Sequence, residues 1–364
     1  MRFRKELEKI RIYEAGKPIE LIARDYSVAE NEIIKVASNE NPFGTSPKVK
    51  AKIAELIGKM HRYPDDGCYA LKTALAEKYS VGGGNIVIGS GSDQIFEFIS
   101  HALLERGDVV LQNKITFAMY AIYSAQIGAV TITTDTNRHD LRAFEKLLAK
   151  NPRLIYICTP SNPYGDALNK EEVFAFLDKV SAQTLVVIDG AYMEYAAFKD
   201  PKKRIEPKEL IDRFPNTIYA GTFSKAYGLG GMRVGYGIAQ EDIIEALHKI
   251  RAPFNITTLS LAAASEALSD GEFVAKSAEH NFREMARYES FAREIGLEYE
   301  PSYANFITLL FPQSRSASEA ANALLKRGMI ARDLKSYDLN ALRVTIGLES
   351  ENDRFFKLFR EYWR

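Results

Sequence analysis

The sequence predicts an α/β protein with two domains: a large one, in which helices flank a mostly parallel central sheet, and a smaller α+β one. Two observations support this prediction. The chain has 364 residues, more than the ~250–300 that usually share one hydrophobic core. From residue 48 onward, short β-branched runs alternate with helical patterns, and near-continuous apolar strands with helices between them are typical of a parallel sheet covered on both faces.

The strands of the large domain are expected where β-branched and apolar residues run together. The segments between them, such as 93–104 and 170–180, are long enough for crossover helices. Earlier in the chain, Ser46 and Pro47 have the residue types of a helix N-cap and first turn, and the charged residues 1–10 predict an amphipathic helix. The expected strands are 86–88, 109–111, 130–133, 154–157, 185–188 and 217–219.

The pattern changes near residue 270, where the smaller domain is expected. A long charged helix over 272–295 precedes a strand at 306–310, a helix at 317–326 and a strand at 342–346. We therefore divide the chain into three parts. They are an N-terminal segment (1–30) that packs with the small domain, a large domain (31–265) and a small C-terminal domain (266–364).

Composition excludes several classes of partner and site. Lysine plus arginine (48) equals aspartate plus glutamate (48), so no basic field predicts a nucleic-acid or membrane-surface partner. No apolar run approaches the ~18 residues of a membrane span, and the first residues lack the apolar core of a secretory signal. Two cysteines and five scattered histidines predict neither a disulfide framework nor a metal site. We expect a cytoplasmic protein.

A phosphate-binding turn is expected after the first strand. Ligands of an open parallel sheet lie beyond the carboxyl ends of its strands, and residues 89–93 read Gly-Ser-Gly-Ser-Asp before a helical pattern. Glycines allow a tight turn, and amides at a helix start attract anions. Gln94 takes the third glycine position of a dinucleotide fingerprint, and Asp108 precedes the next strand instead of ending it. A plain strand-to-helix turn is the alternative.

Two further strand ends carry polar side chains. Asn162 lies between two prolines in a loop that suits a hydrogen bond to a ligand oxygen, although Asn-Pro turns are also common. Asp189 ends an apolar strand and is followed by Tyr192. A buried carboxylate needs a positive partner, which a pyridinium nitrogen or a structural arginine would supply.

The segment with the most candidate functional groups is 221–235, in which hydroxyls, one lysine and one arginine alternate with glycines. Hydroxyl groups and arginine suit a phosphate. Neighbouring cations would depress the pKa of Lys225 and make it a competent imine former. For the lysine alone, a surface loop is a fair alternative.

In combination these features are more specific. The phosphate turn, Asn162, Asp189 and, 36 residues later (225 − 189), a Ser-Lys followed by an arginine resemble the fold-type-I pyridoxal-phosphate-dependent aminotransferases. The chain is similar above all to the histidinol-phosphate aminotransferase family, over nearly its whole length. The segments that carry the resemblance are 37–44, 61–65, 89–93, 116–120, 158–165, 189–192, 222–235 and 342–347.

The resemblance implies a cofactor, pyridoxal 5'-phosphate, and roles for individual residues. Lys225 matches the lysine that forms an imine with the cofactor and then moves a proton. Asp189 matches the acid that keeps the pyridine nitrogen protonated, and Asn162 and Tyr192 match the pair that hydrogen-bonds its ring oxygen. Phe117 stands where an aromatic ring, usually tyrosine, stacks on the cofactor. The residues that match the phosphate-holding set are Ser92, Asp93 (through its amide), Thr222, Ser224, Arg233 and, from the neighbouring subunit of a homodimer, Tyr63.

The resemblance also implies the reaction: ping-pong transamination between L-histidinol phosphate and 2-oxoglutarate in histidine biosynthesis. Arg343 matches the arginine that binds the substrate carboxylate, and Arg332 matches a residue used for the substrate phosphate. Tyr13 and Asn41 complete the expected substrate-binding set. Two positions depart from the family pattern. They are Tyr164, where threonine is common, and Gly190, which replaces a small or acidic residue.

Other activities remain open at this point. A threonine-phosphate decarboxylase and an aromatic-amino-acid aminotransferase share the same fold. A nucleotide-dependent oxidoreductase is opposed by the broken glycine fingerprint. A non-catalytic binding module is opposed by the presence of Lys225 with its whole expected surroundings.

Overall fold

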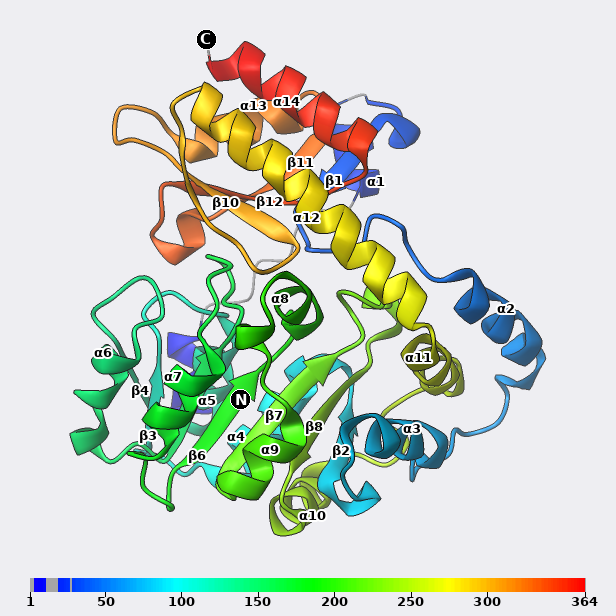
Figure 1. The fold of residues 1–364 in the computed structure, drawn as a ribbon, viewed down its shortest axis with the longest axis vertical. Coiled ribbons are helices and arrows are strands. Elements are labelled where there is room, and N and C mark those ends of the chain that lie inside the picture. The colour runs from blue at the N-terminus through cyan, green and yellow to red at the C-terminus, as the bar shows by residue number, and fades with distance from the viewer. Residues whose placement is uncertain (1–2, 11–18, 27, 364) are drawn as a thin grey trace.

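The computed structural model describes residues 3–10, 19–26 and 28–363. It has two layered units, each built on its own sheet, and the long helix α12 (Gly271–Glu294) runs from one unit to the other (Figure 1). The two sheets have seven and five strands. This is the α/β architecture with a smaller α+β unit that the alternation of strands and helices predicts.

The large sheet is parallel except for one strand. Its order is β2-β8-β7-β6-β5-β3-β4, and β8 runs antiparallel to both of its neighbours. All six predicted strands are confirmed. The sheet consists of these six strands and of β8, which was not predicted. Its strands are β2 (Ile86–Gly89), β3 (Val109–Gln112), β4 (Val130–Thr133), β5 (Leu154–Cys158), β6 (Leu185–Asp189), β7 (Thr217–Thr222) and β8 (Gly235–Ala239).

Helices cover both faces of this sheet, so its strands are buried from both sides. One face packs against α4 (Gly91–Leu103), α5 (Met119–Ile127) and α10 (Glu241–Ile250). The helices of the other face are α2 (Pro47–Leu56), α3 (Tyr69–Tyr79), α6 (Leu141–Glu145), α7 (Lys170–Leu177), α8 (Met193–Lys199), α9 (Pro207–Arg213) and α11 (Thr258–Ser269). Ser46 caps α2 as expected, because its hydroxyl accepts a hydrogen bond from the Lys48 amide.

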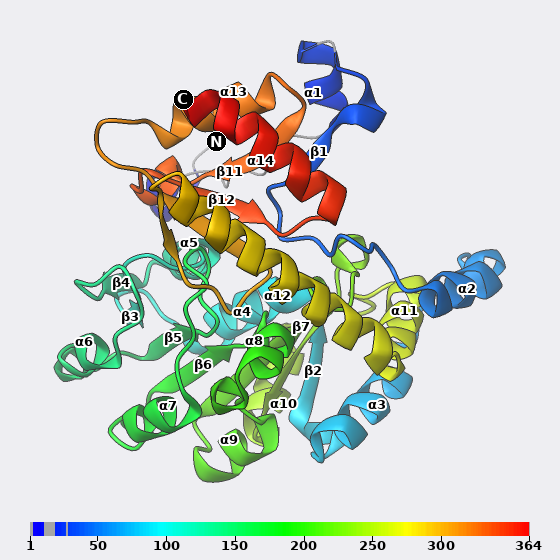
Figure 2. The same ribbon diagram turned by 45° about the horizontal axis from the view of Figure 1, so that its top comes forward.

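The small sheet has the order β1-β11-β12-β10-β9, and only its β1–β11 pair is parallel. Three helices, α12, α13 and α14, share a core with it. α13 and α14 lie above the sheet, away from the large unit, whereas α12 continues from the sheet to the large unit and packs against α8 (Figure 2). The elements of this unit are β1 (Ile34–Val36), β9 (Glu298–Glu300), β10 (Phe306–Leu310), α13 (Ala317–Leu325), β11 (Met329–Asp333), β12 (Ala341–Thr345) and α14 (Glu349–Trp363).

The N-terminal part divides between the two units, which changes the domain bounds that we expected. β1 pairs with β11, so residues 34–36 belong to the small sheet and not to the large domain. Helix α1 (Ile19–Tyr26) packs on the small unit through Ile22, as expected. The short 3-10 helix Lys5–Lys9, where we expected an amphipathic α-helix, instead lies against the large unit, because Glu6 forms an ion pair with Arg106. Long-range pairing of this kind leaves no local pattern.

None of the described helices combines the length and the apolar character that a membrane crossing requires.

Candidate active site

The lysine of the glycine-rich segment lies at the boundary of the two units. Lys225 follows β7, and its Nζ lies 3.4 Å from the carbonyl oxygen of Ser38 and 5.7 Å from the centre of the Tyr192 ring. Burial, and next the positive charge of Arg343, lower the pKa of Lys225 from 10.5 to about 8. A substantial fraction of the amine is therefore neutral near physiological pH, as a nucleophile or base requires.

Asp189 ends β6 beside this lysine. Its carboxylate accepts hydrogen bonds from the Tyr120 hydroxyl and from the Ala191 amide, which lies 3.0 Å away. Burial raises the pKa of Asp189 to about 6, although both hydrogen bonds oppose the rise. A cationic nitrogen placed against this carboxylate would offset the burial and keep it ionised.

The predicted phosphate residues come together at the start of α4. The Arg233 Nη1 donates to the Ser224 hydroxyl at 3.3 Å, and the Thr222 hydroxyl lies 3.0 Å from the same oxygen. The guanidinium also lies over Gly91, where a Cβ atom would stand 2.5 Å from Nη2. This cluster combines hydroxyl groups, a helix N-terminus and an exposed arginine, the groups that bind phosphate.

Asp93 and Gln94 complete this turn. The Asp93 carboxylate accepts from the Tyr123 hydroxyl at 3.0 Å, and burial raises its pKa. Its side chain is thus engaged with Tyr123, which leaves its backbone amide as the expected phosphate contact. The Gln94 side chain accepts from the Ser90 amide at 2.8 Å and from Asn255 at 2.9 Å. A glutamine therefore stabilises the turn where a dinucleotide site would have glycine.

The small unit contributes an arginine from β12. Arg343 donates to Asn162 Oδ1 at 2.5 Å and to the Ala37 carbonyl at 2.9 Å. Its guanidinium lies 5.2 Å from the centre of the Phe306 ring. Arg343 and Asn162 are buried, so these contacts fix the arginine at the entrance to the Lys225 region.

The predicted phosphate arginine lies directly beside it. Arg332 on β11 pairs with Arg343 across the antiparallel ladder, which places both side chains on the same face of the sheet. Thr308 and Glu300 continue this row on β10 and β9. Like charges opposite each other are unfavourable, so the pair favours an anionic ligand at this face.

Comparison with known proteins agrees with this geometry. A family model described as aminotransferase class I and II matches residues 31–357. The chain is 57% identical over 362 residues to a histidinol-phosphate aminotransferase of Aliarcobacter butzleri, and the match covers 99% of each chain. It is 54% identical over 363 residues to one of Wolinella succinogenes, over 100% of this chain and 99% of the relative. The chain belongs to the histidinol-phosphate aminotransferase family of class I and II aminotransferases.

Solved structures match over the same length. The histidinol-phosphate aminotransferase of Sinorhizobium meliloti, solved in complex with pyridoxal-5'-phosphate, has a TM-score of 0.89 at 27% identity and covers 99% of this chain and 98% of its own. An aspartate aminotransferase mutant of Thermus thermophilus has a TM-score of 0.84 at 20% identity, over the full length of both chains. At that identity the likeness shows the fold alone, fold-type-I, as the sequence predicts.

One residue that we did not select, Asn39, contacts the predicted site residue Tyr192. Asn39 donates from Nδ2 to the Tyr192 hydroxyl at 2.9 Å, and its backbone amide donates to Thr345. Its φ of 55° is left-handed, which asparagine tolerates better than most residues. It belongs to the segment 37–44, where we had selected Asn41 instead.

Asn41, which the resemblance assigns to substrate binding, forms hydrogen bonds inside the protein. Its Nδ2 donates to the Ala226 carbonyl and to the Ser277 hydroxyl, both at 2.9 Å, and its Oδ1 accepts from the Phe43 amide. These contacts tie the residue after Lys225 to α12. In this arrangement Asn41 holds the lysine turn in place, with its amide engaged inside the protein and not turned toward a substrate.

The remaining expected residues lie at three places. Phe117 packs edge-on against Tyr120, 5.5 Å between ring centres, on the side of Asp189. Tyr63 is 82% exposed and stacks on Phe254. Tyr13 lies outside the described residues.

The two departures from the family pattern have structural reasons. Tyr164 is buried and does not face the solvent. Its ring is enclosed near Glu300, Arg138 and Asn137, where the two units meet. Gly190 has no room for a side chain, because a Cβ atom there would lie 2.3 Å from the Tyr219 hydroxyl.

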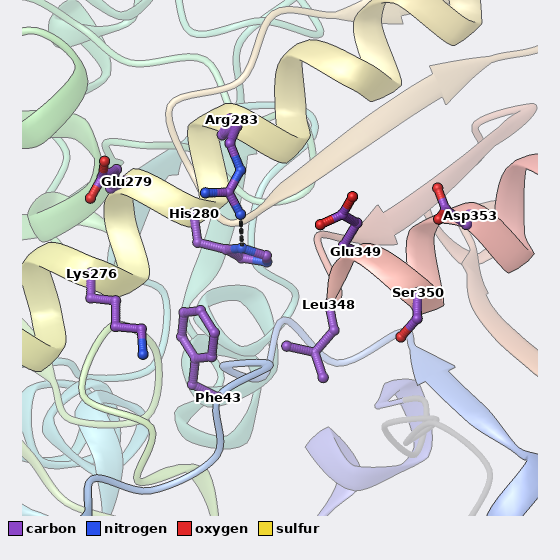
Figure 3. Close-up of a pocket in the computed structure, with 9 residues that line it drawn as sticks. All are labelled: Phe43, Lys276, Glu279, His280, Arg283, Leu348, Glu349, Ser350 and Asp353. Atoms are coloured by element: carbon purple, nitrogen blue, oxygen red, sulfur yellow. Dashed lines mark hydrogen bonds between the residues drawn. The ribbon is translucent and has the colours of Figure 1, made fainter.

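A surface cavity of about 700 Å³ lies elsewhere, between α12 and the start of α14 (Figure 3). Its lining includes Phe43, Lys276, His280 and Glu349. His280 receives a hydrogen bond from Arg283 on Nδ1 and contacts the Gly347 carbonyl through Nε2. None of the predicted site residues lines this cavity.

Among the described residues, no three His, Cys, Asp or Glu side chains gather as a metal site.

Proposed function

We propose that this chain transfers the amino group of L-histidinol phosphate to 2-oxoglutarate, with pyridoxal phosphate as its cofactor, in histidine biosynthesis. The observation that carries the proposal is the pairing of Arg332 with Arg343 on the face beside Lys225. Arg343 suits the carboxylate of 2-oxoglutarate, and Arg332 suits the phosphate of histidinol phosphate. Family membership at 57% identity supports the same reaction.

The residues present fit the cofactor. The cluster of Thr222, Ser224 and Arg233 at Gly91 offers an anion site. Asp189, with its pKa raised by burial, would hold the pyridine nitrogen. When bound, pyridoxal phosphate supplies an aldehyde that takes up amino groups and a ring that withdraws electrons from the neighbouring carbon.

The chain's own residues supply the rest of the reaction. Lys225, with its pKa of about 8, accepts the proton from the substrate Cα as a neutral amine and returns it on the other side of the transfer. Asn162 and Tyr192 would hold the oxygen of the cofactor ring by hydrogen bonds. Arg343 is held in place by Asn162 and the Ala37 carbonyl before any substrate binds, so little reorganisation is needed.

Arg332→Ala tests the phosphate role. Removal of the guanidinium should reduce kcat/KM for L-histidinol phosphate about ten- to one-hundred-fold, the order of a charge-assisted contact of ~1.5–3 kcal/mol. The matched measurement uses L-histidinol, which lacks the phosphate and should lose little. An equal loss for both substrates would remove Arg332 from this role.

A homodimer with shared sites is part of the proposal. Four apolar side chains within residues 57–69 are exposed, and the exposed Phe254 stacks on one of them, Tyr63. Exposed apolar groups of this kind are typical of a subunit interface. Tyr63 lies among them, and we propose that it reaches the phosphate of the neighbouring subunit. The members of this patch are Ile57, Met60, Tyr63, Tyr69 and Phe254.

We also propose a cytoplasmic location, where a biosynthetic enzyme with two free, buried cysteines would keep them reduced.

A further inference from the structure

Three polar side chains from separate elements meet below the Lys225 turn. Lys78, near the end of α3, extends over the ring of Tyr227 and donates to its hydroxyl at 2.5 Å. The carboxylate of the half-buried Glu194 of α8 lies near the same hydroxyl and contributes to its electrostatic environment. Tyr227 itself is buried, so one phenol bridges an ammonium group and a carboxylate.

The chemistry of the three groups fixes which of them donates. An ammonium group can only donate, so the phenol accepts from Lys78 and has its single proton free to face the Glu194 carboxylate. Burial raises the pKa of Tyr227 well above its ordinary value, which keeps the phenol protonated. The loss of this one oxygen would leave both charged groups without their shared partner.

Other tyrosines fill the space around this bridge. The Tyr79 and Tyr236 hydroxyls lie 2.5 Å apart. A Cβ atom at Gly221 would stand 2.2 Å from the Tyr236 ring, and one at Gly190 would meet the Tyr219 hydroxyl. The phenol rings thus pack closely against the backbone at Gly190, just after β6, and at Gly221 in β7.

The bridge connects the two chain segments that surround the Lys225 amine. Tyr227 lies two residues after Lys225, inside a turn closed by the Gly228 amide and the Lys225 carbonyl at 3.0 Å. Glu194 lies two residues after Tyr192, whose ring centre is 5.7 Å from Lys225 Nζ. A contact between Tyr227 and Glu194 therefore fixes the distance between these two segments.

We propose that Tyr227, held between Lys78 and Glu194, is a positioning residue that fixes the Lys225 turn against the segment from Asp189 to Tyr192 and so sets the affinity of the chain for pyridoxal phosphate. The inference rests on the proposed function for the identity of the cofactor. Tyr227 itself contacts neither the cofactor nor the substrate in this role.

The test is Tyr227→Phe, with Tyr288→Phe as the matched control. Tyr288 is equally buried and donates one hydrogen bond, to Asn352 at 3.0 Å, in the small unit. We expect Tyr227→Phe to weaken the binding of pyridoxal phosphate to the apo chain about ten-fold, the order of one hydrogen bond to a charged group. It should also change the pH dependence of Lys225 acylation, followed by mass spectrometry. The control should change neither, even where both variants lose similar thermal stability.

A second variant distinguishes the loss of this bridge from a general folding defect. Glu194→Gln keeps the shape of the bridge but removes its negative charge, and should weaken cofactor binding in the same direction. The double variant should lose no more than Tyr227→Phe alone, because both changes break one bridge. Cofactor affinity and Lys225 acylation equal to those of the Tyr288→Phe control would overturn the proposal. A wild-type chain that binds pyridoxal phosphate but leaves histidinol phosphate unchanged would refute the proposed substrate without affecting this result.

Discussion

At the scale of single residues, the two central groups of the site have pKa values that water would not give them. Burial lowers the pKa of Lys225 to about 8 and raises that of Asp189 to about 6. Both shifts follow from desolvation of the charged form. Buried ionisable groups that serve a chemical role commonly reduce the stability of the protein without its ligands.

Lys225→Met should therefore stabilise the apo chain. The folded chain binds fewer protons than the unfolded chain between pH 8 and the ordinary pKa of 10.5, so this group makes stability rise with pH across that window. Below pH 8 the amine is charged in both the folded and the unfolded chain, so the whole cost of burying an ammonium group lowers the stability of the fold. The gain from methionine should be on the order of 2 kcal/mol near neutral pH and shrink as the pH rises through the window. Urea unfolding at several pH values measures it, and a gain independent of pH would contradict this explanation.

Residue types alone predicted most of the site but could not choose between neighbours. Lys225, Asp189 and Arg233 were predicted because their types and spacing fit one chemistry. Asn39 and Asn41 stand two positions apart in the same segment, and only the left-handed backbone at Asn39 turns its amide toward Tyr192. No pattern in the sequence reports that conformation.

At the scale of elements, one loop joins the two units. Pro163 accepts from the Thr308 hydroxyl, and Gly165 accepts from the Tyr303 amide at 2.7 Å. Asn162, in the same loop, accepts from Arg343. The loop after β5 thus holds its site residue through contacts with the small sheet.

Gly165→Ala should loosen that loop. Gly165 has a φ of 88°, and a Cβ atom there would lie 2.3 Å from the Ser302 hydroxyl oxygen. We expect a loss of roughly 2–3 kcal/mol in the free energy of unfolding and a higher KM for both substrates. Adding Ser302→Gly should restore part of the stability, since it removes the clash but not the backbone strain. Full restoration, or no loss from the single change, would show that the loop tolerates a side chain.

Two of the strands that the sequence missed, β8 and β1, have identifiable causes. β8 is rich in glycine, and Gly235 is required because a Cβ atom would stand 2.2 Å from the Ser92 amide. β8 therefore contains glycine because the phosphate turn lies close against its backbone, and residues with high strand propensity would not fit there. β1 is short, and it is defined only by pairing with β11, almost three hundred residues later. The six predicted strands of the large sheet, in contrast, are rich in apolar and β-branched residues.

At the scale of the whole molecule, the site needs both units and, in our proposal, a second copy. The large unit supplies Lys225 and the phosphate residues, and the small unit supplies Arg332 and Arg343. The exposed patch around Tyr63 lies outside this set, which fits a contribution to a partner's site.

Mixed dimers test the shared site directly. Lys225→Ala and Tyr63→Ala chains should each be nearly inactive alone, but a mixed dimer contains one site with both residues intact. Equal mixing after dissociation should restore about one quarter of wild-type activity, because half of the dimers are mixed and each has one good site. The activity of the mixture would stay at the level of the separate variants if every site were built from a single chain.

The most direct test of the central claim compares substrates on the purified holoprotein. Glutamate formation from 2-oxoglutarate should have a far higher kcat/KM with L-histidinol phosphate than with L-phenylalanine, and O-phospho-L-threonine should release no carbon dioxide. Lys225→Ala should abolish all turnover. Preference for phenylalanine, or decarboxylation of phosphothreonine, would contradict the assignment and transfer it to one of the other activities of this fold.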